Sequence, residues 1–183
     1  MPHLDQSLAF LEQLELPRTA RIIDVGGGAS TLVDDLLARG YERPTVLDLA
    51  APALAAAQAR LGAAANAVDW IAADITTAAL PPATFDLWHD RAVFHFLTTA
   101  VARAAYVARL RHALRPGGAV ILATFAADGP LKCSGLPVAR YDAAAQRAAL
   151  GAGFDRLADV HCLHHTPWGS TQAFQYGLFR FAG

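Results

Sequence analysis

The chain has 183 residues, 54% of them hydrophobic, and a formal net charge of −1 at pH 7, which favours one domain, residues 1–183, with a sizeable core. Its arginines are scattered instead of forming a basic stripe, and no apolar run approaches the ~20 residues of a membrane span, so we expect neither nucleic acid nor a membrane as a partner. Two cysteines and an N-terminus without a signal-type segment predict a cytoplasmic protein with reduced thiols.

The first predicted element is a helix, which lies within residues 1–19. Leu8, Leu11 and Leu14 recur at helical spacing, and Pro17 ends the pattern because proline cannot continue a helix. We expect this helix to pack on the domain that follows.

The segment 21–40 predicts a strand, a tight glycine turn and a helix. Ile22, Ile23 and Val25 form the apolar, β-branched run of a buried parallel strand. Glycines in the turn permit positive φ and let a ligand approach the backbone, and the helix N-terminus offers free N–H groups to an anion. The candidate ligand-binding residues of this turn are Asp24, Gly26, Gly27, Gly28 and Ser30. Replacing Gly26 by valine should therefore block the ligand and leave the fold largely intact.

The second and third predicted strands both end in an aspartate. Residues 44–49 end at Asp48 and Leu49, and Asp48 follows the glycines at close to the ~20 residues expected for an acid that binds ribose hydroxyls. Residues 68–75 end at Asp74 and Ile75. Asp74 is either a second ligand-binding acid or the cap of the turn that follows it.

The fourth predicted strand, residues 85–91, ends in polar residues. His89, Asp90 and Arg91 come last, and His95 follows them closely. In an open α/β sheet the ligand lies at the carboxyl ends of the strands, where the strand order reverses. These side chains are therefore candidates for the reacting end of the site.

The last part of the chain predicts further helices, a buried strand and a final hairpin. The segment 126–141 is too long for a minimal connection, and loops after strand ends often carry specificity in α/β enzymes. Trp168, in the turn of the hairpin, is a candidate for the wall of a substrate pocket. The remaining predicted elements are a helix over 101–114, a strand over 119–125, a helix over 142–150 and extended segments over 154–165 and 171–181.

The histidine- and cysteine-rich segment 161–165 raises the question of a metal site. Alternation along a strand places His161 and His165 on one face and Cys162 and His164 on the other. Because this separation leaves no complete ligand set, we assign no metal site and expect pocket or surface histidines.

The order and spacing of these motifs resemble those of the class I (seven-strand) S-adenosylmethionine (SAM)-dependent methyltransferases, in particular a small bacterial branch. The Asp24-x-Gly26-x-Gly28 register is similar to the family's acidic-x-Gly-x-Gly-x-Gly motif, with Ser30 at the last glycine. A Leu-Arg-Pro-Gly-Gly turn before an apolar strand also resembles the family. The resemblance covers about residues 20–125.

The resemblance implies a three-layer α/β/α sandwich with a Rossmann-like, seven-stranded, mostly parallel sheet and an antiparallel C-terminal strand. It implies SAM as the cofactor and S-adenosylhomocysteine as the product. Asp48 and Leu49 would contact the ribose, Asp74 and Ile75 the adenine, and Asp90 the transfer site. The N-terminal helix would cover the cofactor, while the substrate side would comprise 126–141 and 154–181.

Methyl transfer from a sulfonium is an in-line displacement, which gains mainly from orientation of the two reactants. A base is needed only if the acceptor arrives protonated. By position, the candidates for that catalytic role are His89, Asp90 and His95, with His164 or His165 as further choices from the hairpin.

The acceptor is not readable from the motifs. We expect a small molecule, and a protein side chain is the next choice. Two other functions stay open. One is a nicotinamide-dependent oxidoreductase, against which Thr31 argues because it stands where the dinucleotide-binding pattern Gly-x-Gly-x-x-Gly has its last glycine. The other is a non-catalytic SAM- or metal-binding module that uses the hairpin.

Overall fold

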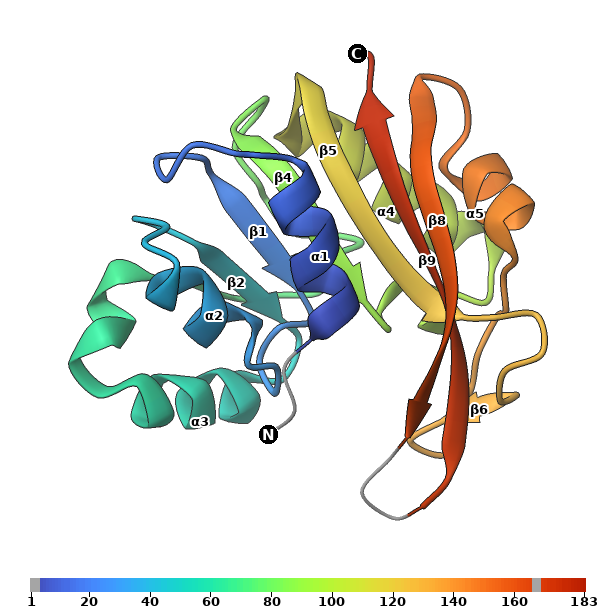
Figure 1. Ribbon diagram of the computed structural model, residues 1–183, viewed down its shortest axis with the longest axis horizontal. Coiled ribbons are helices and arrows are strands. Elements are labelled where there is room, and N and C mark those ends of the chain that lie inside the picture. Colours follow the sequence, from blue (N-terminus) through green and yellow to red (C-terminus); the bar gives the residue numbers. More distant parts are fainter. Residues whose placement is uncertain (1–3, 166–168) are drawn as a thin grey trace.

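A seven-stranded sheet organises the computed structural model, which describes residues 4–165 and 169–183 (Figure 1). Its strands are β1 (Ile22–Val25), β2 (Thr45–Asp48), β3 (Asp69–Ala72), β4 (Phe85–Arg91), β5 (Leu114–Phe125), β8 (Phe154–His165) and β9 (Thr171–Phe181). The strand order is β3-β2-β1-β4-β5-β9-β8. The first five strands of that order pair in parallel, and β9 pairs antiparallel with both of its neighbours. This arrangement confirms the predicted fold class.

Helices cover both faces of the sheet. The α-helices are α1 (Asp5–Gln13), α2 (Leu32–Ala38), α3 (Ala51–Leu61), α4 (Ala100–Ala113) and α5 (Ala143–Leu150). Buried residues of α1 and α2 share one apolar cluster with the sheet, and α3 packs beside α2 in a smaller cluster. Buried residues of α4 and α5 share the cluster on the opposite face. In Figure 1, α1 crosses in front of the sheet and α4 lies behind it.

Local chemistry explains where the helices begin and end. The side chain of Asp142 caps α5 by accepting from the amide of Ala145, and Thr99 caps α4 in the same way. The helix α1 ends shortly before Pro17, as its sequence predicts. None of the helices in the described ranges is both long and apolar enough to cross a membrane.

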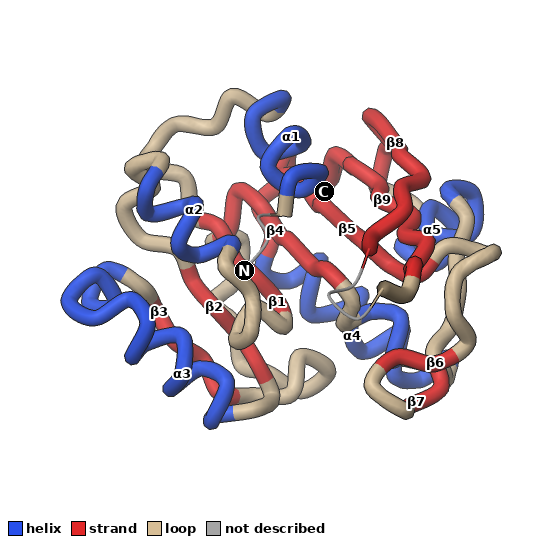
Figure 2. Tube along the Cα trace, turned by 60° about the horizontal axis from the view of Figure 1, so that its bottom comes forward, coloured by secondary structure: helices blue, strands red, loops and turns tan. Residues whose placement is uncertain are grey.

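Three segments differ from the sequence-based expectation. The predicted Arg-Pro-Gly-Gly turn belongs to β5, where the register against β4 shifts and Gly117 adopts a φ of +81°. A 3₁₀ helix (Gly62–Ala67) follows α3 directly. The long loop over 126–141 contains a small antiparallel pair, β6 (Lys132–Cys133) and β7 (Leu136–Pro137), which stands apart from the main sheet in Figure 2. Trp168 lies outside the described residues.

Side chains along β4 alternate between the two faces of the sheet, and this alternation divides the polar residues at its end. His89 and Arg91 point to the α1 face, where they meet α1 and β9. Trp88 and Asp90 point to the α4 face, where both bond to the hydroxyl of Tyr106. Neighbouring residues in the sequence thus belong to different environments.

The Tyr106 hydroxyl is the hub of a buried polar cluster. It accepts from Trp88 Nε1 at 2.8 Å and donates to Asp90 Oδ2 at 2.6 Å. Burial raises the pKa of Tyr106 well above its ordinary value, so the phenol keeps the proton that it donates. All three side chains are fully buried, so removing one partner leaves polar groups without compensation.

We therefore expect Tyr106→Phe to lower the free energy of unfolding by about 2–3 kcal/mol, since hydrogen bonds to charged groups are worth ~1.5–3 kcal/mol. Urea denaturation followed by circular dichroism measures this change. Tyr41→Phe is the matched control, because this buried ring packs under Arg18 and lies outside the cluster. An equal loss in both variants would contradict the role of the Tyr106 hydroxyl.

Candidate functional site

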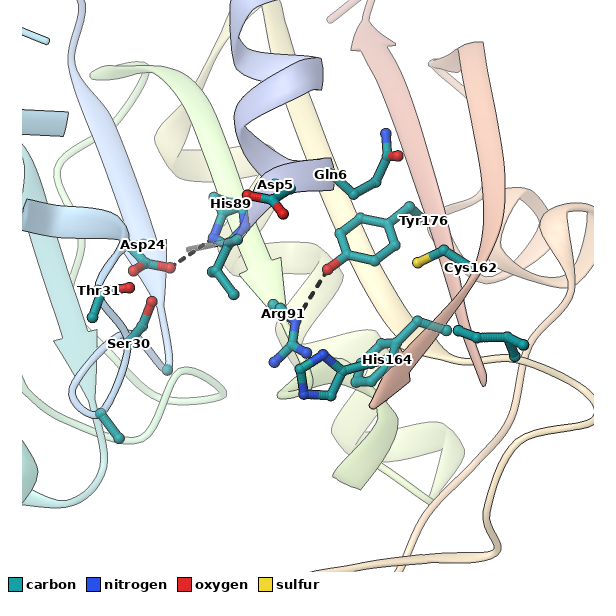
Figure 3. Close-up of a pocket in the computed structure, with 15 residues that line it drawn as sticks. Asp5, Gln6, Asp24, Ser30, Thr31, His89, Arg91, Cys162, His164 and Tyr176 are labelled. Carbon is teal, nitrogen blue, oxygen red and sulfur yellow. Dashed lines mark hydrogen bonds and ion pairs between the residues drawn. The ribbon is translucent and has the colours of Figure 1, made fainter. Parts of the chain in front are cut away.

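A cavity of about 530 Å³ opens at the carboxyl edge of the sheet, on the α1 face (Figure 3). Four parts of the chain line it: the start of α1, the glycine turn after β1, the end of β4, and the β8–β9 hairpin. The first and last of these parts are far apart in the sequence. The strand order brings them together, because β1 and β4 are neighbours and the hairpin follows β5.

The glycine turn is shaped by the protein's own packing. Gly26 has a φ of +75°, and its amide donates to the carbonyl of Leu47 at 2.7 Å. A Cβ added at Gly26 would collide with the side chain of Val93, and one at Gly27 would lie 2.6 Å from Asp24 Cγ. The expectation that Gly26→Val leaves the fold intact is therefore wrong. The valine would be strained and would clash before any ligand arrives.

A buried pair, Asp24 and His89, links β1 to β4. The two residues are direct partners in the parallel register, and His89 Nδ1 lies 2.7 Å from Asp24 Oδ1. Both are almost completely buried. The second carboxylate oxygen, Oδ2, is buried and has no hydrogen-bond partner among the described residues. Asp24 also lines the cavity, and this oxygen has lone pairs that no group of the described chain uses.

The pair continues into α1, where His89 Nε2 lies 2.9 Å from Ser7 Oγ. On the same face of the sheet, Arg91 Nε donates to the Tyr176 hydroxyl at 3.0 Å. A carboxylate only accepts, so with a neutral imidazole Nδ1 donates to Asp24 and Nε2 accepts from the Ser7 hydroxyl.

Ser7 and Tyr176 are the functional residues that sequence reasoning missed. A signal was present for each. Ser7 stands on the same helical stripe as Leu11 and Leu14, where a polar residue is out of place. Tyr176 alternates with the buried Phe174 along β9 and so faces the same side.

Asp48 lies at the carboxyl end of β2, on the other side of the glycine turn from the β8–β9 hairpin. Its Oδ2 accepts from the amide of Gly28 at 3.0 Å, and its Oδ1 accepts from the amide of Ala50 at 2.8 Å. Each carboxylate oxygen has a further lone pair for an added hydroxyl. Leu49 beside it is 75% exposed, so its side chain is accessible to a ligand.

The predicted residues Asp74, Ile75 and Ser30 all have partners within the protein. Asp74 is exposed at the end of β3, and its Oδ1 accepts from the amide and hydroxyl of Thr76 at 2.8 and 2.7 Å. Ile75 is buried in the core on the α4 face. Ser30 Oγ accepts from the amide of Leu32 at 3.0 Å and also lines the cavity.

Of the three predicted base candidates, His89 is the one that lines the cavity. Asp90 is fully buried on the opposite face, where it accepts from Tyr106 and from the amides of Val93 and Phe94. Burial raises the pKa of Asp90 to about 6 despite these bonds.

His95 is also buried, and its Nδ1 accepts from the amide of Phe125 at 3.3 Å. Burial and then the charge of Arg91 lower the pKa of His95 to about 4, so this imidazole is neutral at pH 7. Its Nε2 has no partner among the described residues.

The hairpin histidines divide as alternation predicts. Cys162 and His164 line the cavity, while His161 turns away and bonds to Asp128 at 2.9 Å. Within residues 4–165 and 169–183, no three histidine, cysteine or acidic side chains come together as a metal-binding group.

Comparisons with known proteins place this geometry in a family. Residues 22–118 match the model described as a methyltransferase domain. An uncharacterized methyltransferase of Mycobacterium tuberculosis (strain H37Rv), Rv0089, is 37% identical over 118 residues, or 64% of this chain and 56% of the relative. The match thus spans little more than half of that relative's length.

Solved structures show the same fold. The 1,6-didemethyltoxoflavin-N1-methyltransferase of Burkholderia thailandensis, with bound 1,6-didemethyltoxoflavin and S-adenosylhomocysteine, has a TM-score of 0.76 at 22% identity, covering 98% of this chain and 78% of that one. The [4+2]-cyclase SpnF has a TM-score of 0.76 at 17% identity, covering 97% and 80%. A cyclase among these neighbours shows that the fold alone does not set the chemistry.

The pKa of Asp90 predicts how stability depends on pH. Its folded-state pKa is about 6, above the ordinary 3.8, so its contribution to folding is fully present below pH 3.8 and is lost as pH rises through 6. We expect the wild type to gain about 2 kcal/mol over Asp90→Asn between pH 7 and pH 4. Urea denaturation at both pH values measures this difference. Asp155→Asn, at an exposed carboxylate, is the control, and a pH-independent difference for Asp90→Asn would refute the expectation.

Proposed function

Because the chain belongs to the methyltransferase-domain family, with SAM as its cofactor, we propose that the protein transfers the cofactor's methyl group to a small-molecule acceptor. The observation that carries the proposal is Asp24, a carboxylate that lines the cavity next to the glycine turn and whose buried Oδ2 has no partner among the described residues. A carboxylate oxygen at that point suits the ammonium group of an amino acid, which SAM carries.

The other proposed cofactor contacts lie at the carboxyl ends of β2 and β3. Asp48 would accept from the ribose hydroxyls beside exposed Leu49, and Asp74 would accept from the adenine amino group with its second oxygen. The glycine turn lies between these ends, and Gly26 lines the cavity there. The donors and acceptors present thus fit SAM.

When bound, SAM supplies a methyl group on a positively charged sulfur, which an acceptor lone pair displaces in line. The protein's part is to hold the two reactants in one orientation, which can supply ~7–11 kcal/mol. The helix α1 and the β8–β9 hairpin flank the cavity and would limit the entry of water. His89 would take a proton at Nε2, by way of Ser7, if the acceptor arrives protonated.

A small acceptor agrees with the size of the cavity, about 530 Å³. A protein side chain is the second candidate, favoured by the exposed leucines Leu131, Leu136 and Leu163 on the loop and the hairpin. Family membership argues against a nicotinamide-dependent oxidoreductase. The cytoplasm stays the predicted compartment.

Two variants test the cofactor assignment with two ligands. 5′-Methylthioadenosine shares the ribose and adenine of S-adenosylhomocysteine but lacks its amino-acid group. We expect Asp24→Asn to weaken S-adenosylhomocysteine at least tenfold and 5′-methylthioadenosine less than threefold, because the amide has no second acceptor for the ammonium. Asp48→Ala should weaken both ligands at least tenfold.

Calorimetry measures all four affinities, and each variant serves as the control of the other. The same pattern of losses in both variants would sink the assignment of Asp24 to the amino-acid end. Failure of the wild type to bind SAM or S-adenosylhomocysteine would overturn the proposed function itself.

The loop that carries β6 and β7 is proposed to shape the acceptor side. Its C-terminal end is fixed by the amides of Ala139 and Tyr141, which donate to the carbonyls of His95 and Phe125. Replacing residues 132–136 by a glycine-serine linker should therefore keep S-adenosylhomocysteine affinity within about threefold, ~0.7 kcal/mol. It should abolish transfer of a labelled methyl group to those pooled small acceptors that the wild type methylates. An unchanged rate would place specificity elsewhere.

A further inference from the structure

Arg91 is a cation in the cavity wall without an acidic partner. It lies at the end of β4, is half-buried, and lines the cavity together with His164 and Tyr176 (Figure 3). Among the described residues, no carboxylate lies within ion-pair distance of its guanidinium, whereas arginines such as Arg21 and Arg60 have aspartate partners. A partly desolvated charge without a counterion is costly, so this position calls for an anion.

The guanidinium is held in one orientation. Its Nε donates to the Tyr176 hydroxyl at 3.0 Å, and its central carbon lies 4.4 Å from the centroid of the Phe174 ring. Because the Phe174 ring lies against the guanidinium and Nε is already bonded, the terminal nitrogens Nη1 and Nη2 remain for a ligand. An oriented pair of N–H donors matches the oxygens of a carboxylate or a phosphate.

His164 stands next to Arg91 in the cavity (Figure 3). Burial, followed by the charges of Arg91 and His165, lowers the pKa of His164. The imidazole is therefore neutral at pH 7 and adds an N–H donor to the site without a second uncompensated charge.

The end of the cavity near the glycine turn is lined by acidic side chains. Asp24 lies beside Ser30 and Thr31 at the glycine turn, and Asp5 enters from α1 (Figure 3). The acidic end suits the positively charged part of SAM, whose sulfur and ammonium are both cationic. The Arg91 end then remains for the second reactant.

We propose that the methyl acceptor is a small anionic molecule whose carboxylate or phosphate group binds to the terminal nitrogens of Arg91 beside His164. This inference rests on the proposed function and names the substrate class of the same site. The rings of Phe174 and Tyr176 line the same end of the cavity and provide an apolar surface for the body of the acceptor.

The test uses benzoate, phenyl phosphate and benzamide as probes, each titrated into the full chain saturated with S-adenosylhomocysteine and followed by NMR. Benzamide has the shape of benzoate without its charge. We expect the wild type to bind at least one of the two anions tenfold or more tightly than benzamide, and the preferred anion separates a carboxylate from a phosphate site.

Arg91→Gln should reduce this preference to less than threefold and leave the affinity for S-adenosylhomocysteine within threefold. Arg18→Gln is the matched control, since Arg18 also lies over an aromatic ring, that of Tyr41, at 5.0 Å but outside this cavity. It should keep the full preference. Thermal melting shows whether each variant is folded, and if Arg91→Gln unfolds, the wild-type comparison of benzoate, phenyl phosphate and benzamide decides alone.

Three outcomes would overturn the inference. The first is equal binding of the anions and benzamide by the wild type, and the second is a preference that survives in Arg91→Gln. The third is a loss of S-adenosylhomocysteine affinity of tenfold or more in Arg91→Gln with 5′-methylthioadenosine unaffected, which would mean that the cofactor's own carboxylate occupies Arg91. None of these outcomes affects the proposed function, which depends on cofactor binding by the wild type.

Discussion

The bond between Asp24 and His89 is the interaction on which the rest of the site depends. It joins β1 and β4 at the point where the strand order reverses, and it is buried, so breaking it would leave uncompensated polar groups. Through His89 it reaches Ser7 and so determines where α1 lies over the sheet. One carboxylate oxygen serves the structure and the other remains for a ligand.

The glycine turn combines structural and ligand requirements at the same positions. Gly26, Gly27 and Gly28 are required even without a ligand, because a Cβ at each would meet Val93, Asp24 or Asp48. A substitution in the turn is therefore expected to change stability and binding together.

The side chains on the two faces of β4 have different roles: one face borders the cavity and the other forms a buried polar network. His89 and Arg91 face the cavity, while Asp90 lies behind them with Trp88 and Tyr106 in a fully buried network. A carboxylate in such a place costs stability when ionised, but its bonds to the backbone after β4 hold the following turn in position. That turn carries Val93, which closes against Gly26.

Local patterns in the sequence were sufficient for the strands of the main sheet, because apolar periodicity and turn residues act over a few neighbours, but they did not predict the β6–β7 pair. The same patterns nominated Asp24, the glycines and Asp48 as ligand-binding residues, and alternation alone separates His89 from Asp90. Only the tertiary structure decided which face holds the cavity. It also decided that Ser7 meets His89, 82 residues away, and that Arg91 lacks an acidic partner among the described residues, because such contacts depend on how distant elements pack.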